Sequence, residues 1–241
     1  MRFRIRFTLI VRIAVGVSWS VGGCGKGYVG GDDVQPGACA RGTALAFVPQ
    51  TTPSRDSTER IRIYLMRGYQ NEYSLGLDQI ADQLRALNFA PKVIGWPEWM
   101  EAADSIIAED PSLPEGTEYM LVGHSYGADD AIRMALILRD NNIRVKMLFL
   151  IDATVPEPIP DNVDQCIHYY YPWLPGFLAP WFFSGNPVIA EAGNTHTRIT
   201  NLLFTREALG DVVGCANHFS IEANQYMQNR VIEAAIQLLD D

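Results

Sequence analysis

The amino-acid sequence predicts a single-domain α/β protein with a mostly parallel sheet and helices on both faces. Three observations predict it. From residue 60 onward, short apolar runs alternate with amphipathic stretches, which is the pattern of a parallel sheet. The run Val145–Ile151 is strongly apolar, as expected of a strand buried on both faces. The chain has 241 residues, enough for one substantial domain with a single core.

The apolar spacing places each element in order. We expect strands at residues 62–65, 92–95, 118–122, 145–151, 165–171 and 199–204. We expect helices at 77–87, 99–107, 126–139 and 221–239, because apolar side chains recur there at helical spacing. In such a sheet, ligands bind at the carboxyl ends of the strands.

A pentapeptide at that edge of the sheet carries the first chemical signal. Residues 123–127 read Gly-His-Ser-Tyr-Gly and stand between a strand-like run and a helix-like run. A Gly-x-Ser-x-Gly segment in this context forms a tight, strained turn that exposes the serine hydroxyl. Glycine is needed where the turn crowds the neighbouring strand and helix. Ser125 is therefore the candidate nucleophile.

A serine hydroxyl needs a base, and the chain has four histidines. His218 lies in the loop before the last helix, from which an imidazole can reach the carboxyl edge of the sheet, so it is the preferred base. His124 stands inside the serine turn, displaced from the attack geometry. His168 lies in an aromatic strand and is expected to be structural, and His196 is a weaker rival.

The base in turn needs an acid partner. Asp152 ends the strand that follows the nucleophile strand and would emerge at the same edge, so we favour it. Many enzymes of this architecture carry the acid one strand later, where this sequence has Pro172-Trp173-Leu174-Pro175 and no carboxylate. Asp152 could also be a strand-end residue that binds loop amides. Other carboxylates also remain open: Glu157, Asp161 and Glu191, with Asp129 and Asp130 expected to cap or solvate the helix after the serine.

Acyl transfer also requires donors for the developing oxyanion. The backbone N–H of Tyr126 opens the helix after the nucleophile and is the first candidate. The second should come from the loop after the first strand, where Gly68 allows a close approach to the site. We expect the N–H of Tyr69 to be this donor.

The serine turn, Asp152 after the next strand and His218 before the last helix together resemble the α/β-hydrolase superfamily. The resemblance covers residues 60–240. Three segments resemble those of small bacterial thioesterase-like and lipase-like hydrolases: Arg67-Gly68, residues 123–129 and Asn217-His218-Phe219. It implies hydrolysis of a small carboxylic ester or thioester through a Ser-His-Asp triad, without a metal or organic cofactor. The aromatic segment 168–183 is too short for a large lid, and it could be a short apolar cap or a packed loop.

The N-terminus has a different composition. Arg2, Arg4 and Arg6 precede an apolar stretch from Phe7 to Val21. Residues 1–23 therefore resemble a signal peptide, and the protein is expected to be exported, to the periplasm or beyond. The ending Val21-Gly22-Gly23-Cys24 resembles a bacterial lipobox, which would attach Cys24 to a membrane. Residues 24–59 are expected to form a flexible tether leading into a hydrolase domain at 60–241.

The net charge and the spacing of the cysteines limit the partners and the metal sites that we expect. The formal net charge of −9 argues against a nucleic-acid partner. The cysteines have no zinc-site spacing, and Cys166–Cys215 is a candidate disulfide in an oxidising compartment. Two other functions use the same residues: a binding protein that kept the fold and lost the chemistry, or an acyltransferase.

Overall fold

The structure is a computed structural model that describes residues 45, 52–71, 74–171 and 185–240. The expected signal peptide, Cys24, most of the expected tether and most of the segment 168–183 lie outside this range. Within the tether range, Arg55–Thr58 forms the short helix α2. Thr58 is buried there, and its hydroxyl donates to the carbonyl of Asn88 at 2.8 Å.

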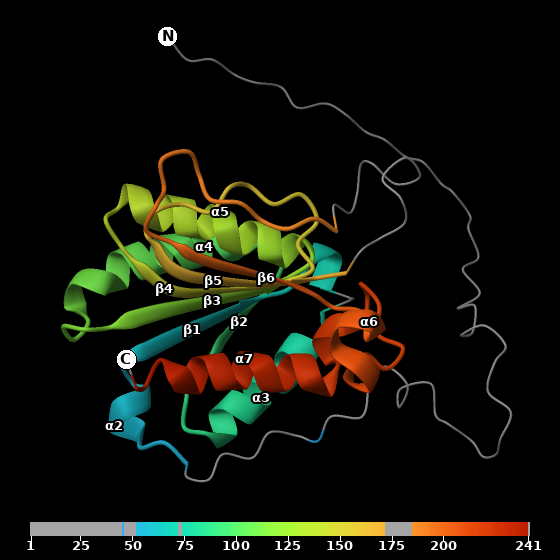
Figure 1. The fold of residues 1–241 in the computed structure, drawn as a ribbon. Coiled ribbons are helices and arrows are strands. Elements are labelled where there is room, and N and C mark those ends of the chain that lie inside the picture. The colour runs from blue at the N-terminus through green and yellow to red at the C-terminus, as the bar shows by residue number, and fades with distance from the viewer. Residues whose placement is uncertain (1–44, 46–51, 72–73, 172–184, 241) are drawn as a thin grey trace, which may run out of the picture. The chain divides into compact units, whose positions relative to one another are not determined.

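The described strands form one six-stranded sheet in the order β2-β1-β3-β4-β5-β6, and every neighbouring pair is parallel (Figure 1). This confirms the predicted fold class. The strands are β1 Ile61–Met66, β2 Lys92–Ile94, β3 Glu118–His124, β4 Val145–Ile151, β5 Val163–Tyr170 and β6 Arg198–Leu203. All strands point the same way, so their carboxyl ends share one edge.

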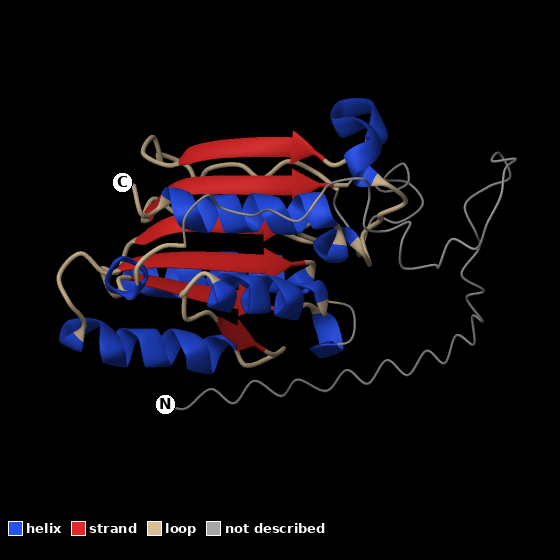
Figure 2. Cartoon of the chain, turned by 90° about the horizontal axis from the view of Figure 1, so that it is seen from below, coloured by secondary structure: helices blue, strands red, loops and turns tan. Residues whose placement is uncertain are grey.

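Helices cover both faces of the sheet. Helices α3 (Gly76–Ala86) and α7 (Gln225–Gln237) lie on one face, and α4 (Trp99–Glu109) and α5 (Tyr126–Asp140) lie on the other (Figure 1). Figure 2 shows the strands side by side behind the helices of one face. The short elements are the helix α6 Arg206–Leu209 and the 3₁₀ turns η1 Tyr69–Asn71, η2 Asp110–Ser112, η3 Gly210–Val213 and η4 Ile221–Ala223.

The sheet divides the buried apolar residues into two clusters, where the sequence led us to expect one core. Successive side chains of a strand point to opposite faces. In β4, Phe149 therefore packs with α3 and α7, and Leu148 packs with α4 and α5. This is why β4 is apolar along nearly its whole length.

The last helix begins later than its apolar spacing suggested. Asn224 has extended backbone angles, and its side chain accepts hydrogen bonds from the N–H groups of Tyr226 and Met227. An asparagine in this position caps the first turn of a helix. Helix α7 thus begins at Gln225, and the preceding Ile221–Ala223 forms a separate 3₁₀ turn.

The expected Cys166–Cys215 disulfide is wrong. Cys166 is a free, buried thiol that packs in the cluster on the α4 and α5 side. Cys215 is disulfide-bonded, but its neighbours Val213 and Ala216 pack in the cluster on the α3 and α7 side. The sheet therefore separates the two cysteines.

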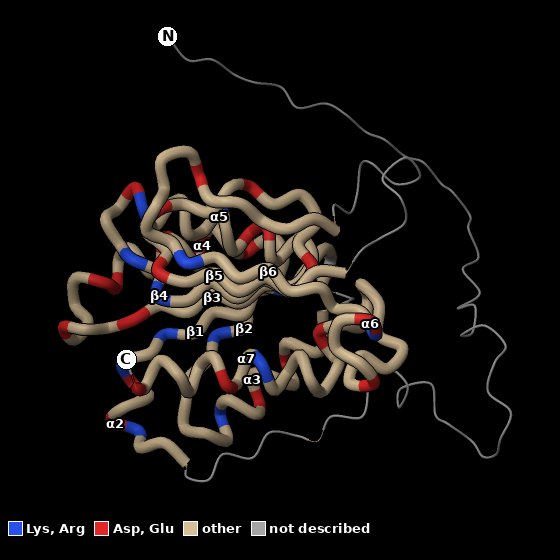
Figure 3. Tube along the Cα trace, viewed as in Figure 1, with Lys and Arg blue, Asp and Glu red and all other residues tan. Residues whose placement is uncertain are grey.

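Charged residues are spread over the described surface. Figure 3 shows Lys and Arg interspersed with Asp and Glu over the helices and loops instead of gathered in one stripe. Among the described residues, no helix has the length and apolar character needed to cross a membrane.

Candidate active site

Ser125 occupies a strained turn between β3 and α5. Its backbone angles are φ 58° and ψ −128°, a region that residues with a side chain rarely adopt. Its N–H donates to the carbonyl of Ile151 at 2.9 Å, which ties the turn to the end of β4. The predicted serine turn is therefore present.

The two glycines of the pentapeptide allow this turn. A Cβ on Gly123 would lie 2.2 Å from the carbonyl oxygen of Gly127. A Cβ on Gly127 would lie 2.1 Å from the carbonyl oxygen of Met66 in β1. Helix α5 can start this close to the sheet only because both side chains are absent.

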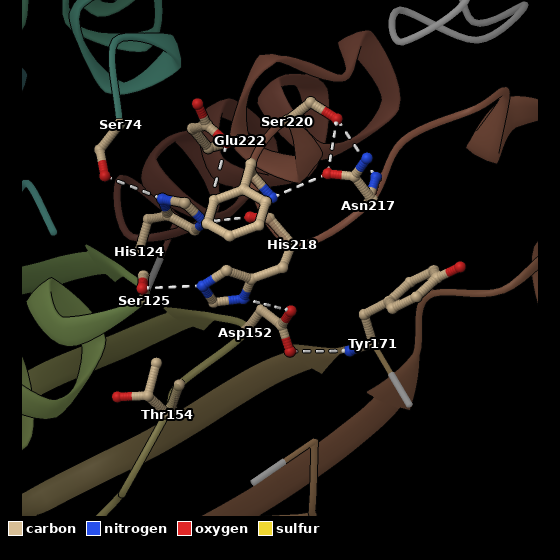
Figure 4. A network of polar contacts seen from close by, with 12 residues as sticks. Ser74, His124, Ser125, Asp152, Thr154, Tyr171, Asn217, His218, Ser220 and Glu222 are labelled. Atoms are coloured by element: carbon tan, nitrogen blue, oxygen red, sulfur yellow. Dashed lines mark hydrogen bonds and ion pairs between the residues drawn. The ribbon is translucent and has the colours of Figure 1, made fainter. Parts of the chain in front are cut away.

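Three buried side chains form a continuous hydrogen-bonded series at the carboxyl edge of the sheet (Figure 4). Ser125 Oγ lies 2.9 Å from His218 Nε2, and His218 Nδ1 lies 2.8 Å from Asp152 Oδ2. They come from the β3–α5 turn, the loop before α7 and the end of β4. The structure thus brings together the three residues that the sequence singled out as nucleophile, base and acid.

Both carboxylate oxygens of Asp152 are engaged. Oδ2 faces His218, and Oδ1 accepts the N–H of Tyr171 at 2.9 Å. The residue has a positive φ of 49°, and its own N–H donates to the carbonyl of Tyr169 at 2.7 Å. These bonds fix the carboxylate in one orientation toward the imidazole.

His168 supports the loop that follows Asp152. Its Nε2 accepts the N–H of Ala153 at 3.3 Å, and its Nδ1 lies 3.2 Å from Asn201 Oδ1. Burial lowers the pKa of His168 to about 4, so the ring is neutral and can accept this bond. Its position agrees with the structural role expected from the sequence.

The residues of the two expected oxyanion donors, Tyr126 and Tyr69, line the same cavity as Ser125. Tyr126 is the first residue of α5, where a backbone N–H has no partner within the helix. Tyr69 begins η1, in the loop after β1. That loop touches the nucleophile, because a Cβ on Gly68 would lie 3.2 Å from the Cβ of Ser125.

A cavity of about 120 Å³ opens on the serine. The ring of Tyr69 packs against those of Trp96 and Tyr126, with centroid separations of 4.9 and 6.0 Å. The wall is mainly aromatic and contains no Lys, Arg, Asp or Glu among the described residues. Its lining residues are Gly68, Tyr69, Ser74, His124, Ser125, Tyr126, His218 and Phe219.

The rival residues lie elsewhere. His196 is exposed and pairs with Asp164 near the start of β5, at the opposite edge of the sheet. Glu157 and Glu191 form ion pairs with arginines on α5, namely Arg133 and Arg139. Asp161 is exposed.

The two aspartates of α5 are both buried. Asp130 pairs with Arg133 at 2.7 Å. Asp129 is not solvated as expected, because its carboxylate accepts the N–H groups of Thr154 and Val155 and the hydroxyl of Thr154. Burial raises the pKa of Asp129 to about 6. Asp129 thereby anchors the loop after Asp152 to α5.

Two polar residues at the site were not found from the sequence. Ser74 and Glu222 are buried beside His124, the residue before the nucleophile. The turn Gly123–Gly127 signals only the serine itself, and no spacing rule pairs His124 with either residue. Among the described residues, no group of three or more His, Cys, Asp or Glu side chains could hold a metal ion.

Comparisons with known proteins give a likeness at the level of structure. No protein-family model matches the chain, and no curated protein matches it. The RedJ thioesterase of prodiginine biosynthesis in Streptomyces coelicolor is 13% identical, with a TM-score of 0.46 over 80% of this chain and 96% of that chain. Human thioesterase 2 is 13% identical, with a TM-score of 0.43 over 75% and 96% of the two chains. An arylesterase is 10% identical, with a TM-score of 0.44 over 75% of each chain.

Proposed function

We propose that the protein is a serine hydrolase that cleaves carboxylic esters or thioesters through an acyl-enzyme. The observation that carries this proposal is the buried series from Ser125 Oγ to His218 Nε2 and from His218 Nδ1 to Asp152 Oδ2, with separations of 2.9 and 2.8 Å. Both distances are within hydrogen-bonding reach for a nucleophile, its base and the group that orients the base.

Acylation begins when Ser125 Oγ attacks the substrate carbonyl carbon. His218 Nε2 takes the hydroxyl proton, and the carboxylate of Asp152 stabilises the imidazolium through Nδ1–H. The N–H groups of Tyr126 and Tyr69 are proposed to bind the oxyanion. As the tetrahedral intermediate collapses, His218 returns the proton to the leaving oxygen or sulfur, and the acyl group stays on Ser125.

Deacylation repeats these steps with water. His218 takes a proton from the attacking water and gives it to Ser125 Oγ as the acid leaves. The aromatic wall of the cavity favours an apolar acyl group.

Turnover of p-nitrophenyl butyrate and of a butyryl thioester tests the proposal, with Ser125→Ala as the blank. Ser105→Ala is the matched control, because this exposed serine on α4 bonds only the carbonyl of Glu101 among its described contacts. We expect wild type and Ser105→Ala to hydrolyse the substrates and Ser125→Ala to lose at least about 10³-fold in kcat.

Equal rates for wild type and Ser125→Ala would favour a binding protein instead. A fluorophosphonate probe gives a second readout, since it should label wild type at Ser125 and leave the alanine variant unlabelled. Adding an alcohol and identifying the products separates hydrolysis from acyl transfer.

Export remains part of the proposal. The disulfide at Cys215 supports an oxidising compartment. Expression with and without globomycin, followed by intact-mass measurement, tests cleavage before Cys24 and lipid attachment to it. A full-length, unprocessed chain in both cultures would contradict the proposed leader.

A further inference from the structure

A second series of hydrogen bonds lies beside Ser125 and uses none of the three proposed catalytic side chains; Figure 4 shows its part from Ser74 through His124 to His218. The N–H of Gly68 donates to Ser74 Oγ at 2.9 Å. Ser74 Oγ lies 2.9 Å from His124 Nδ1, and His124 Nε2 lies 2.8 Å from the carbonyl oxygen of His218. Ser74, His124 and His218 are all buried.

The groups at the two ends, an N–H donor and a carbonyl acceptor, fix which atom donates in each hydrogen bond of this series. A carbonyl oxygen only accepts, so His124 Nε2 must carry a proton and donate it to His218. In the neutral ring, Nδ1 then accepts the hydroxyl of Ser74, whose oxygen accepts the N–H of Gly68. Burial lowers the pKa of His124 to about 3, which keeps the ring neutral, and each donor has one acceptor.

The series joins three parts of the site. One end holds the main chain of His218, the proposed base. The other end holds Gly68, which precedes the proposed oxyanion donor Tyr69 and lies against Ser125. His124, in the middle of the series, is the residue before Ser125. It occupies the last position at which β3 pairs with β4, opposite Ile151, and this pairing fixes its backbone.

We infer that His124 is a positioning residue that holds the loop of the base and the oxyanion loop in register with the nucleophile. This inference rests on the proposed function. A buried leucine could fill the same volume, but it would release both the His218 carbonyl and Ser74. Displacing a reacting group by about 1 Å can cost about 100-fold in rate, so His124 affects turnover without touching the substrate's reacting atoms.

Two ionisable side chains, those of Glu222 and His218, face the ring of His124. Its Oε2 lies 3.8 Å from His124 Nε2, and this buried oxygen has no hydrogen-bond partner among the described residues. Burial raises the pKa of Glu222 to about 8, so the carboxyl is neutral at pH 7 and does not draw the Nε2 proton away from the His218 carbonyl.

Two conservative variants separate the halves of the series. In His124→Gln the side-chain amide nitrogen can occupy the place of Nε2 and still donate to His218. In His124→Asn the shorter amide reaches only the place of Nδ1, beside Ser74. We expect kcat for p-nitrophenyl butyrate to fall about 100-fold in His124→Leu and His124→Asn and about tenfold or less in His124→Gln, with KM within about threefold throughout.

Ser74→Ala tests the other end. Removing its hydroxyl frees the N–H of Gly68 and should lower kcat by about tenfold to 100-fold, through the oxyanion loop. The matched control is Asn162→Ala, at the opposite edge of the sheet, where the amide donates to the carbonyls of Ala135 and Ile143 at 3.0 and 2.9 Å. It should lower the unfolding midpoint and leave kcat unchanged.

Different results would overturn this inference and the proposed function on which it rests. A folded His124→Leu variant with kcat within about threefold of wild type would overturn the inference, as would a loss of kcat in Asn162→Ala equal to that in His124→Leu. If His124→Leu does not fold, His124→Asn and Ser74→Ala decide by the same criterion. Absence of Ser125-dependent turnover in wild type would instead refute the proposed function itself.

Discussion

Replacing Asp152 with asparagine should move the ring proton of His218 from Nδ1 to Nε2 while leaving the backbone in place. Asp152 accepts two hydrogen bonds, from the N–H of Tyr171 on Oδ1 and from His218 Nδ1 on Oδ2. Asparagine has one side-chain oxygen. The main-chain N–H of Tyr171 can only donate, whereas an imidazole can change tautomer, so the oxygen should face Tyr171 and the amide nitrogen should face His218.

The consequence falls on the base. An amide N–H directed at His218 Nδ1 requires a lone pair there, so the ring proton moves to Nε2, which then faces Ser125 Oγ as a donor. A base in this tautomer cannot take the serine proton, and the loss in kcat should be about 10⁴-fold, or about 5 kcal/mol of barrier. The positive φ of 49° at Asp152 is tolerated by asparagine, so the fold should survive.

Ester hydrolysis by Asp152→Asn, wild type and the Ser125→Ala blank measures this loss. Asp161→Asn makes the same change of charge on an exposed residue and should retain wild-type kcat. Thermal unfolding of each variant shows that it is folded. An Asp152→Asn variant that is folded and keeps kcat within about tenfold of wild type would refute the assignment of the acid.

Other predictions follow from packing and charge. Gly127→Ala should destabilise the fold by about 3 kcal/mol or more, because its Cβ would lie 2.1 Å from Met66 O; Gly193→Ala, which has a positive φ but open space, should cost only about 1 kcal/mol in urea unfolding. Tyr69→Ala keeps the backbone N–H and removes a wall of the cavity, so a series of p-nitrophenyl esters should show a shift toward longer acyl chains. Burial raises the pKa of Glu222 from 4.5 to about 8, so the folded protein holds a proton that the unfolded chain releases in this range. The free energy of unfolding should therefore fall as pH rises from about 4.5 to about 8, and Glu222→Gln should weaken this dependence in urea titrations.

Much of the fold could be predicted from the sequence because burial on both faces leaves strong apolar signals. The run Val145–Ile151 became β4 at those bounds. The start of α7 could not be placed from periodicity, since Ile221 continues the apolar spacing of the helix. The cap at Asn224 depends on its side chain reaching two N–H groups, which apolar spacing does not show.

The candidate residues of the site could be selected because a parallel sheet places its strand ends at one edge. Ser125 and Asp152 follow adjacent strands, and the loop before α7 returns His218 to the same edge. No comparable rule of sheet topology locates the residues that support the site. Ser74 meets His124 because of the path of the loop after β1, and its hydrogen bond joins residues 50 positions apart.

The two strained residues of the site show how the sheet stabilises this arrangement. Ser125 and Asp152 both have positive φ, of 58° and 49°, and such angles cost about 1–3 kcal/mol each. Each follows the last residue of a central strand, and each donates its N–H to a carbonyl near the end of the next strand. Ser125 donates to Ile151, the last residue of β4, at 2.9 Å, and Asp152 donates to Tyr169, the last residue but one of β5, at 2.7 Å. At both positions the hydrogen-bond ladder of the parallel sheet therefore extends by one bond past the last residue with regular strand geometry. Because this bond belongs to the main chain, the orientation of both side chains is set by the sheet and should persist in variants that replace the side chains alone.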